Sequence, residues 1–333
     1  MIAVVVFLAL VPILFISSVV RPVLQFLYLL ALAQMWNLLA GYAGLVSIGQ
    51  QAYVGLGGYS LLFFADTLGI NVFVAVVLAG LVAGILSVPT AGLVFRLRGG
   101  YFAIGTWVVA EVYRLIVANT SELGGGSGAT ITSAVSIDPT LRQFVTYWIA
   151  LAVGVGSVLV VAVVLRSRLG LALRAIRDRE GAAATLGVDV LRTKFKVYVL
   201  ASTLTGLTGA VIYLSFLRLQ PSATFSVNWT AFMIFSVVIG GIGSISGPII
   251  GTALYFLLQQ YLADLGALYL IILGVAAILI VLKAPRGLWG LVTDRWDVDL
   301  FPVTVRARRT RGGGDSLSVQ AVAAEPFSRG RSG

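Results

Sequence analysis

Residues 166–196 read RSRLGLALRAIRDREGAAATLGVDVLRTKFK, and they form the one long polar segment that lies between apolar runs. The chain of 333 residues is 59% hydrophobic and only 11% charged, whereas soluble domains are usually about a quarter charged. A water-soluble fold cannot bury so much apolar surface, so lipid must surround most of this chain. The quoted segment is therefore predicted to be a polar loop between membrane-spanning helices.

Apolar runs lie on both sides of this loop. A helix needs about 20 residues to cross a bilayer, and several of the runs are shorter and rich in glycine. Some helices are therefore expected to be broken, tilted or covered by their neighbours. The predicted fold class is an all-α polytopic integral membrane protein with about ten transmembrane helices. The first run has no charged start and no evident cleavage site, so an uncleaved first span is expected. The ten runs are residues 1–20, 23–39, 51–64, 72–95, 102–117, 144–165, 197–217, 229–239, 249–262 and 267–282.

The basic residues are distributed unevenly between the two predicted sides of the membrane. Nineteen of the 23 basic residues fall on one side, namely Arg96, Arg98, eight within residues 166–196 and nine from Lys283 onward. Because cytoplasmic loops carry an excess of Lys and Arg, this side and both termini are predicted to be cytoplasmic. The formal net charge of +10 is thus attributed to topology and not to nucleic-acid binding. The predicted outer side carries Arg21, Arg142 and Arg218.

The composition excludes several kinds of chemistry. Cys and His are both absent, which removes disulfides, the usual zinc and haem ligands and His-based catalysis. None of Lys194, Lys196 and Lys283 follows a glycine, so the chain has no phosphate loop of the G-x-x-x-x-G-K-[ST] type. We therefore expect no catalytic site, no metal site and no ATP hydrolysis by this chain alone.

Two polar segments lie outside the predicted spans and the central loop. Residues 119–140 contain four glycines and are expected to form a flexible or tightly turned external loop. Residues 304–333 hold clustered arginines without apolar periodicity, which predicts a disordered basic tail that could touch anionic lipid. The predicted division is a transmembrane domain, residues 1–303, followed by this tail.

Within the central loop, apolar residues recur at helical spacing, which predicts a short amphipathic helix. Gly181 is expected to break or bend it, and Gly187 is a natural left-handed C-terminal cap. Such a helix can lie on the bilayer or enter a groove of a partner protein. The mixed charges of Arg179 and Glu180 beside small residues favour a protein groove. The apolar stripe consists of Ala172, Ala175, Ile176, Ala183 and Leu186.

Two glycine-rich segments stand out among the apolar runs. Residues 40–58 read AGYAGLVSIGQQAYVGLGG, and residues 240–251 read GGIGSISGPIIG. They share the pattern G-x-x-S-I, which is compatible with a symmetric transporter fold. For residues 40–58, the favoured interpretation is close helix packing through small residues. The alternative is an interrupted helix whose Ser47, Gln50 and Gln51 line a path. The glycines predicted to break the backbone are Gly41, Gly44, Gly49, Gly240, Gly241, Gly243 and Gly247.

Charged and amide side chains inside predicted spans are further candidates. Glu111 and Arg114 are three residues apart, so they share one helical face. An intramembrane carboxylate is a candidate functional group, although a neutralised structural pair explains the same spacing. Asn37 is expected to join helices through hydrogen bonds. The candidates for a substrate path are Asn37, Ser47, Gln50, Gln51, Glu111 and Arg114.

Four stretches of the chain resemble the branched-chain amino acid permease family of bacterial ABC importers, over about residues 36–290. They are WNLLAGYAGLVSIGQQAYVGLGGY, FRLRGGYFAIGTWVVAEVYRL with the following glycine-rich loop, LRAIRDREGAAATLGVDVLRTKFKVYVLAS, and VVIGGIGSISGPIIGTAL. The chain is most similar to the permease type with the longer N-terminal part. Many relatives carry His where this chain has Gln50. Urea and other amide permeases share much of the pattern.

This resemblance implies a permease subunit in the bacterial inner membrane that translocates leucine, isoleucine, valine or related small amino acids. The implied partners are a second permease, two cytoplasmic ATPases that bind ATP and magnesium, and an extracytoplasmic binding protein. This chain itself would hold no cofactor. A urea, amide or sugar permease and a stand-alone channel or carrier are the alternatives. The residues that match the family's ATPase-coupling segment are Arg174, Arg177, Asp178, Glu180, Ala183, Leu186 and Gly187.

Overall fold

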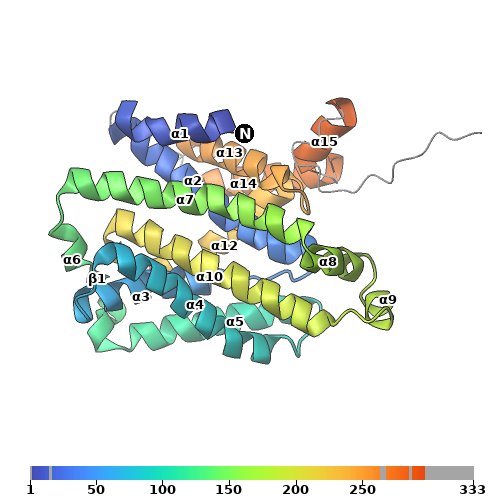
Figure 1. Cartoon of the computed structure of the whole chain (residues 1–333), viewed down its shortest axis with the longest axis horizontal. Coiled ribbons are helices and arrows are strands. Elements are labelled where there is room, and N and C mark those ends of the chain that lie inside the picture. The colour runs from blue at the N-terminus through green and yellow to red at the C-terminus, as the bar shows by residue number, and fades with distance from the viewer. Residues whose placement is uncertain (1, 15–16, 263–267, 285–286, 297–333) are drawn as a thin grey trace, which may run out of the picture. The chain divides into compact units, whose positions relative to one another are not determined.

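The computed structural model describes residues 2–14, 17–262, 268–284 and 287–296, and this part of the chain is almost entirely helical (Figure 1). It belongs to the unit Met1–Val303. The predicted basic tail, residues 304–333, lies outside the described residues. The first helices and turns are α1 (Ile2–Leu14), α2 (Ser17–Asn37), the π-helical turn η1 (Leu38–Tyr42), α3 (Gln51–Leu62), η2 (Phe63–Thr67), α4 (Val72–Val94), α5 (Gly100–Ala118), η3 (Ser121–Leu123) and η4 (Gly125–Ser127).

The rest of the described chain continues the helical pattern, with one small hairpin. Strands β1 and β2 pair in antiparallel fashion, so that Ala129 lies opposite Leu219. The remaining elements are β1 (Ala129–Thr130), α6 (Thr132–Val135), α7 (Pro139–Arg166), α8 (Arg168–Asp178), α9 (Glu180–Thr185), α10 (Val190–Phe216), β2 (Arg218–Leu219), α11 (Pro221–Thr224), α12 (Val227–Gly240), α13 (Ser246–Leu262), α14 (Leu268–Lys283) and α15 (Gly287–Trp296).

Six helical segments among the described residues are long and apolar enough to cross a membrane, so the prediction of about ten was too high. The described residues of the ten apolar runs are almost all helical, but four of the helices are short: α1 has 13 residues, α3 has 12, α13 has 17 and α14 has 16. Described breaks in the backbone precede α3, at residues 43–50, and α13, at residues 241–245, and both breaks are rich in glycine, as the sequence suggested. The six segments are Ser18–Tyr42, Val72–Val94, Gly100–Ala118, Pro139–Arg166, Val190–Phe216 and Pro221–Gly240.

Helices α2 and α10 form the centre of the bundle. Helix α10 packs against α3 and α4, while α2 packs against α7, α12 and α13. In Figure 1 the long helices α2, α4, α7 and α10 run side by side between two ends, one carrying α6 and β1 and the other carrying α8 and α9. The short helix α3 is buried almost throughout, because α4, α5 and α10 cover it.

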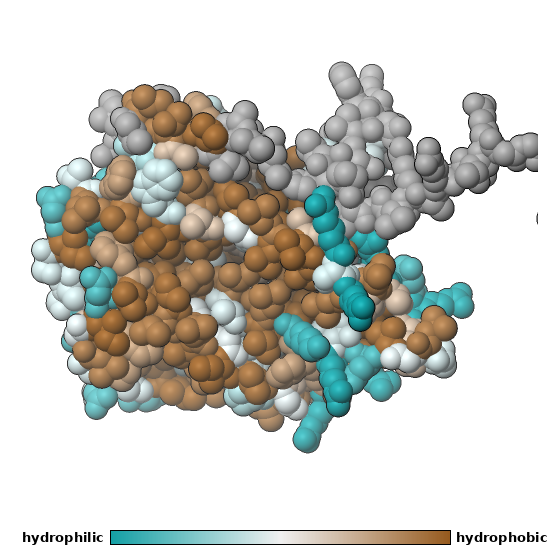
Figure 2. All heavy atoms as spheres, viewed as in Figure 1, coloured by the Kyte–Doolittle hydropathy of each residue, from teal (hydrophilic) through white to brown (hydrophobic). Residues whose placement is uncertain are grey.

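Apolar side chains cover the outside of this bundle as well as its core. On α4, for example, Val74, Val77, Leu81, Ile85 and Val88 are between 46% and 67% exposed and fall on one helical face. Figure 2 shows an apolar band across the visible face, with polar residues gathered toward the two ends. Water would not tolerate such a surface, so the chain is an all-α polytopic membrane protein.

The predicted inner and outer basic residues lie at opposite ends of the bundle. Arg98 lines a cavity together with Lys194 of the central loop region. Arg21 and Arg142 line a second cavity at the other end, and Arg218 lies there in the hairpin. In the part of the chain that the structure describes, these basic residues are thus separated as the sequence predicted, with α8 and α9 at the more basic end.

The glycine-rich outer loop is tightly turned. Besides the β1–β2 pairing, Asp66 of η2 accepts hydrogen bonds from the backbone N–H groups and the hydroxyl groups of both Thr132 and Ser133. Partial burial raises the pKa of Asp66, but the bonds from Ser133 and Thr132 together lower it below its ordinary value. This carboxylate therefore ties the loop to the end of α3 and η2.

Candidate functional site

The first glycine-rich segment is an interrupted helix. After η1 the backbone is non-helical from Ala43 to Gln50, and α3 then begins at Gln51. Gly44 has a φ of +67°, a conformation that strains other L-residues. Close packing is present as well, since a Cβ on Gly49 would lie 2.1 Å from the carbonyl oxygen of Thr106. The segment therefore combines the close packing and the helix interruption that the sequence suggested, while the path along Ser47, Gln50 and Gln51 stays a prediction.

Polar side chains satisfy the backbone groups that this break releases. The Ile48 N–H donates to Thr106 Oγ1 at 3.1 Å, and the Gly49 N–H donates to Ser47 Oγ at 3.2 Å. The Trp36 indole N–H donates to the Ser47 carbonyl at 2.9 Å. Non-helical backbone survives at membrane depth only with such partners, so the break is a built feature of the fold.

Amide side chains at the start of α3 extend these contacts into a buried cluster. Gln51 bonds Thr230 of α12 through both its backbone N–H and its side-chain oxygen. The Thr205 hydroxyl of α10 lies 3.5 Å from Gln50 Oε1. We call the following six residues the polar seam, and each is at most 2% exposed: Ser47, Gln50, Gln51, Thr106, Thr205 and Thr230.

The amide nitrogen of Gln50 is the notable atom in the polar seam. Gln50 is fully buried, yet its Nε2 has no hydrogen-bond partner among the described residues. Leaving a buried donor unpaired costs about 1–3 kcal/mol. Such an atom at a helix break suits the recognition of a passing polar solute.

The second glycine-rich segment forms a second break, between α12 and α13. Asn37 of α2 spans it: its Nδ2 donates to the Ser244 carbonyl at 2.8 Å, and its Oδ1 accepts from the Gly243 N–H at 2.9 Å. Gln34, one turn earlier, donates to the Ile245 carbonyl at 2.8 Å. The expectation that Asn37 joins helices is confirmed, and its partner is the G-x-x-S-I motif itself.

The predicted backbone-break glycines divide into two groups. Gly44, Gly241 and Gly243 have positive φ angles and lie in the breaks. The others lie where two backbones approach each other, and a Cβ on any of them would come within 3 Å of another backbone atom. This second group consists of Gly41, Gly49, Gly240 and Gly247.

Glu111 and Arg114 form an ion pair on α5, as their spacing predicted. Arg114 Nε lies 2.9 Å from both carboxylate oxygens of Glu111. The side chains are 48% and 28% exposed, so the pair lies on the outer face of α5. It is not part of the polar seam. The structure therefore separates these two path candidates from Ser47, Gln50 and Gln51.

The helix of the central loop is broken into two short helices, as expected, but the break is not where it was predicted. The break falls at Arg179, whose extended backbone has φ −156° and ψ 105°, and not at Gly181, which lies within α9. Ser167 caps α8 and begins it before the predicted stripe. Gly187 does adopt the left-handed conformation expected of a cap, with φ +84°.

The apolar face of this loop differs from the predicted stripe. Ile176 and Ala183 are buried as expected, and Leu173 is fully buried although the stripe omitted it. Leu186, in contrast, is 81% exposed. The predicted stripe failed there because the backbone break at Arg179 and the end of α9 change the helical phase.

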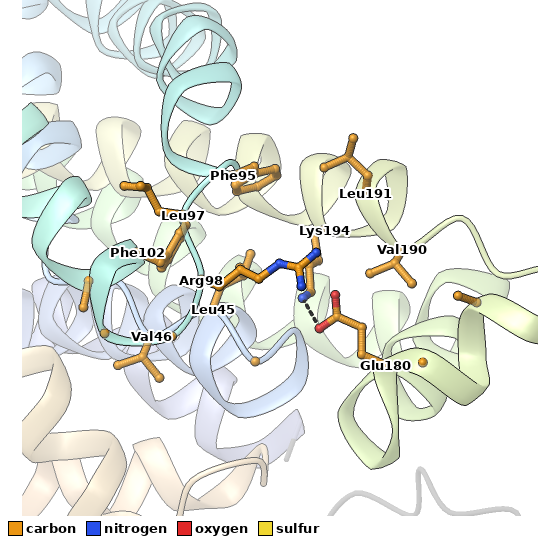
Figure 3. Close-up of a pocket in the computed structure, with 16 residues that line it drawn as sticks. Leu45, Val46, Phe95, Leu97, Arg98, Phe102, Glu180, Val190, Leu191 and Lys194 are labelled. Atoms are coloured by element: carbon orange, nitrogen blue, oxygen red, sulfur yellow. Dashed lines mark hydrogen bonds and ion pairs between the residues drawn. The ribbon is translucent and has the colours of Figure 1, made fainter.

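Among the predicted coupling residues, Arg174, Arg177 and Glu180 have side-chain contacts inside the chain, and Arg174 Nη2 donates to the Leu165 carbonyl at 3.4 Å. The Arg177 guanidinium packs against Gly243 of the second break, since a Cβ there would lie 2.5 Å from its Nη1. Glu180 Oε2 pairs with Lys194 Nζ at 2.8 Å, which joins α9 to α10 (Figure 3). Arg177, Asp178, Gly187 and Leu186 are exposed. The loop thus exposes both charged and apolar side chains, the latter including Leu171 and Leu186, while its inner side contacts both α10 and the second break.

Sequence reasoning missed the partners supplied by other helices. Thr106, Thr205 and Thr230 are threonines in apolar helices, and Lys194 is one of several basic residues. A threonine one turn from small residues is common in membrane helices, so no local signal distinguished these positions.

The sequence of this chain matches a family of known proteins and several of its members. A family model described as branched-chain amino acid transport system / permease component matches residues 18–282. The high-affinity branched-chain amino acid transport system permease protein LivM of Salmonella typhimurium is 26% identical over 278 residues, which cover 76% of this chain and 65% of that protein. The Escherichia coli protein of the same name gives the same identity and the same coverage.

A more distant relative comes from Methanocaldococcus jannaschii. Its probable branched-chain amino acid transport permease protein LivM is 25% identical over 193 residues, which cover 57% of this chain and 55% of that protein. The chain spans about two thirds or less of the length of these relatives: 65% of the first two and 55% of the third. No solved structure matches it significantly.

Proposed function

Because this chain belongs to the family described as branched-chain amino acid transport system / permease component, we propose that it is a transmembrane permease subunit of an ABC importer. The proposed cargo is leucine, isoleucine, valine or a related small amino acid, in keeping with the names of the relatives. The observation that carries the proposal is the family match over residues 18–282, which includes all six long helices.

The proposed partners supply what this chain lacks. Its sequence holds no phosphate loop, no His and no Cys, so the energy for transport comes from two cytoplasmic ATPase subunits that bind ATP and magnesium. A second permease subunit completes the pathway, and an extracytoplasmic binding protein delivers the substrate. In this division this chain is not an enzyme, and it binds no cofactor.

The proposed coupling element is the pair of helices α8 and α9. The pair projects at one end of the bundle between α7 and α10 (Figure 1), and Leu173 and Ile176 anchor it through burial. A displacement of α9 reaches α10 through the Glu180–Lys194 ion pair and through the connection at residues 186–189. Because α10 contributes Thr205 to the polar seam, the same displacement reaches the helix break.

In this mechanism the ATPases bind one arrangement of the coupling helices more tightly than the other. That differential affinity shifts the permease between its two states, because a ligand moves an equilibrium only by its preference for one state. The polar seam is the proposed substrate path. Its residues are at most 2% exposed here, so this arrangement is the closed one, and Gln50 Nε2 is available to a substrate in the open one.

The experiment that tests the proposal is uptake by the reconstituted importer. The chain, its partner permease, the two ATPases and the binding protein are placed in liposomes with ATP on the ATPase side. Radiolabelled leucine should enter only when ATP and all the subunits are present. The matched control contains ATPase subunits that bind ATP but cannot hydrolyse it.

The alternative functions predict other results in the same assay. Transport by this chain alone, without ATPases, would identify a channel or carrier and contradict the proposal. ATP-dependent uptake of urea or a sugar, with no uptake of any aliphatic amino acid, would keep the importer class and overturn the proposed cargo.

A further inference from the structure

A cavity of about 970 Å³ lies at the end of the bundle that carries α9 (Figure 3). Four segments from three distant parts of the sequence bound it. They are the first helix break at residues 44–46, the connection from α4 into the first turn of α5, helix α9 and the first turn of α10. Ligand sites commonly have volumes of about 300–1,000 Å³, so the cavity is large enough for a small solute.

The charges in this cavity do not cancel. Lys194 Nζ pairs with Glu180 Oε2 at 2.8 Å, while Arg98 points toward this pair (Figure 3). Arg98 has no acidic partner within the described part of the chain, and no described group bonds the second carboxylate oxygen of Glu180. Two cationic side chains therefore face one carboxylate, which gives the cavity a net charge of +1. The second carboxylate oxygen of Glu180 is available to accept a hydrogen bond from a ligand.

The remaining walls are apolar. Leu45 and Val46 come from the break, Leu97 and Phe102 from the α4–α5 connection and α5, and Leu191 from α10. A ligand that satisfies all three features has a carboxylate for Arg98, an ammonium group for Glu180 and an aliphatic part for these walls. The zwitterion of an aliphatic amino acid has this combination, whereas inorganic phosphate lacks the last two groups.

The location of the cavity connects it to the proposed path. The break runs without interruption from Gly44 to Val46, which line the cavity, to Ser47 and Gln50 in the polar seam. The opposite wall includes Glu180 of the proposed coupling helix. A bound amino acid would therefore join α9 to the α4–α5 connection across the end of the path.

We propose that this cavity is a second, inner binding site for the zwitterion of an aliphatic amino acid, through which the imported product slows further uptake. The proposal rests on the proposed importer function. A bound product bridges Arg98 and Glu180 and so holds α9 against the bundle. Because it binds the arrangement in which these two side chains face each other, it favours that arrangement and opposes the movement that the ATPases drive.

The test uses the complete importer in liposomes, with unlabelled compounds on the ATPase side and labelled leucine on the other side. Internal leucine should lower the initial uptake rate. Leucinamide, which lacks the carboxylate, and isocaproate, which lacks the ammonium group, should have much weaker effects. Replacing Arg98→Gln should raise the half-inhibitory leucine concentration about tenfold or more, since a charge-assisted hydrogen bond is lost.

Two further variants separate the site from general damage. Arg96→Gln is the matched control, because Arg96 is an exposed arginine two residues away that does not line the cavity. It should retain wild-type inhibition. Gly100 has open space where a Cβ would point, so Gly100→Phe should fill the cavity and abolish inhibition. Each rate is expressed relative to the same variant without internal leucine.

Normal leucine uptake that internal leucine does not slow would overturn the inner site and leave the importer function standing. An unchanged half-inhibitory leucine concentration in the Arg98→Gln variant would also overturn the inner site and leave the importer function standing. Equal inhibition by inorganic phosphate or isocaproate would identify a general anion site in place of the proposed one. Failure of the wild-type importer to take up any aliphatic amino acid would overturn the proposed function first, and this inference with it.

Discussion

Asn37 satisfies the backbone of a distant helix break with a single side chain. Its amide nitrogen and oxygen bond Ser244 and Gly243, which lie more than 200 positions further along the chain. Gly41, one turn later, approaches the Gly243 backbone closely enough that a Cβ would lie 2.7 Å from its nitrogen. Asn37 therefore joins α2 to the second break by hydrogen bonds. An apolar side chain at this position would leave the Ser244 carbonyl and the Gly243 N–H without these hydrogen bonds.

The variant Asn37→Ala tests this role. It leaves one buried carbonyl and one buried N–H without a partner, so the free energy of unfolding should fall by about 2–4 kcal/mol. The measurement is unfolding of the purified protein in mixed micelles as denaturing detergent increases. Asn119→Ala is the control, because Asn119 is exposed and bonds only Leu115 within its own helix. Equal stability of Asn37→Ala and the wild type would contradict the assignment.

Asp66 stabilises the outer loop in a pH-dependent way. Burial raises its pKa and the hydrogen bonds from Ser133 and Thr132 lower it, with a net decrease. A carboxyl whose pKa is lower in the folded state adds stability above its unfolded pKa. That stability is lost as the pH falls through the folded pKa. The loop should therefore loosen only in acid, below the ordinary Asp value of about 3.9.

Replacing Asp66→Asn should remove this dependence. An asparagine offers one acceptor oxygen in place of two, so the Thr132 and Ser133 amides should exchange hydrogen faster than in the wild type at neutral pH. The difference should shrink only as the pH falls through the lowered folded-state pKa of Asp66, because the wild-type carboxyl becomes protonated there. Exchange is followed by mass spectrometry after correction for the intrinsic rate. Protection that is identical in both proteins at neutral pH would show that other contacts hold the loop.

At the scale of elements, α9 has little burial of its own. Ala183 is its one buried residue, while the ion pair from Glu180 to Lys194 joins it to α10. An exposed ion pair contributes only about 0–1 kcal/mol, so it positions α9 without holding it permanently. Such a weak attachment suits the proposed coupling role, in which the proposed ATPase subunits displace α9.

A charge exchange separates two roles for Glu180. If Glu180 acts through Lys194, then Lys194→Glu alone should reduce ATP-dependent uptake, and the double variant Glu180→Lys with Lys194→Glu should restore most of it. If Glu180 instead binds an ATPase directly, the double variant should remain as defective as Glu180→Lys. We expect restoration, because Lys194 is only 16% exposed and lies at 2.8 Å from the carboxylate. Exchange of Arg192 and Asp189, a second local pair, is the control.

At the scale of the whole molecule, the two groups of basic residues that the sequence predicted on opposite sides lie at opposite ends of the bundle. The central loop and Arg98 lie at one end, while Arg21, Arg142 and the β hairpin lie at the other. By the positive-inside tendency, the end that carries α8 and α9 faces the cytoplasm. This orientation stays a prediction, and the coupling mechanism requires it.

The absence of cysteine from the sequence makes the orientation simple to measure. Single cysteines are introduced as Ala184→Cys in α9 and Ser127→Cys in the outer loop, both at exposed positions. A membrane-impermeant maleimide should label Ser127→Cys on intact cells, and should label Ala184→Cys only after permeabilisation. The opposite pattern would place the coupling helices outside the cell and remove the basis for the ATPase contact.

The sequence alone was sufficient for the fold class, the positions of the helices and the separation of charge between two ends. It also predicted the Glu111–Arg114 pair and the left-handed Gly187, because these features depend on composition, helical periodicity and neighbours within a few residues. The helix count was too high because length, and not apolarity alone, decides whether a run crosses the bilayer.

Only the tertiary structure decided which side chains meet. Thr106 lies 58 positions from Ile48, and Thr230 lies 179 positions from Gln51. Periodicity carries no information about such partners. The same holds for the pairing of Glu180 with Lys194 and for the backbone break at Arg179. The physical reason is that a buried polar atom must find a partner wherever packing brings one, and packing is set by all the helices together.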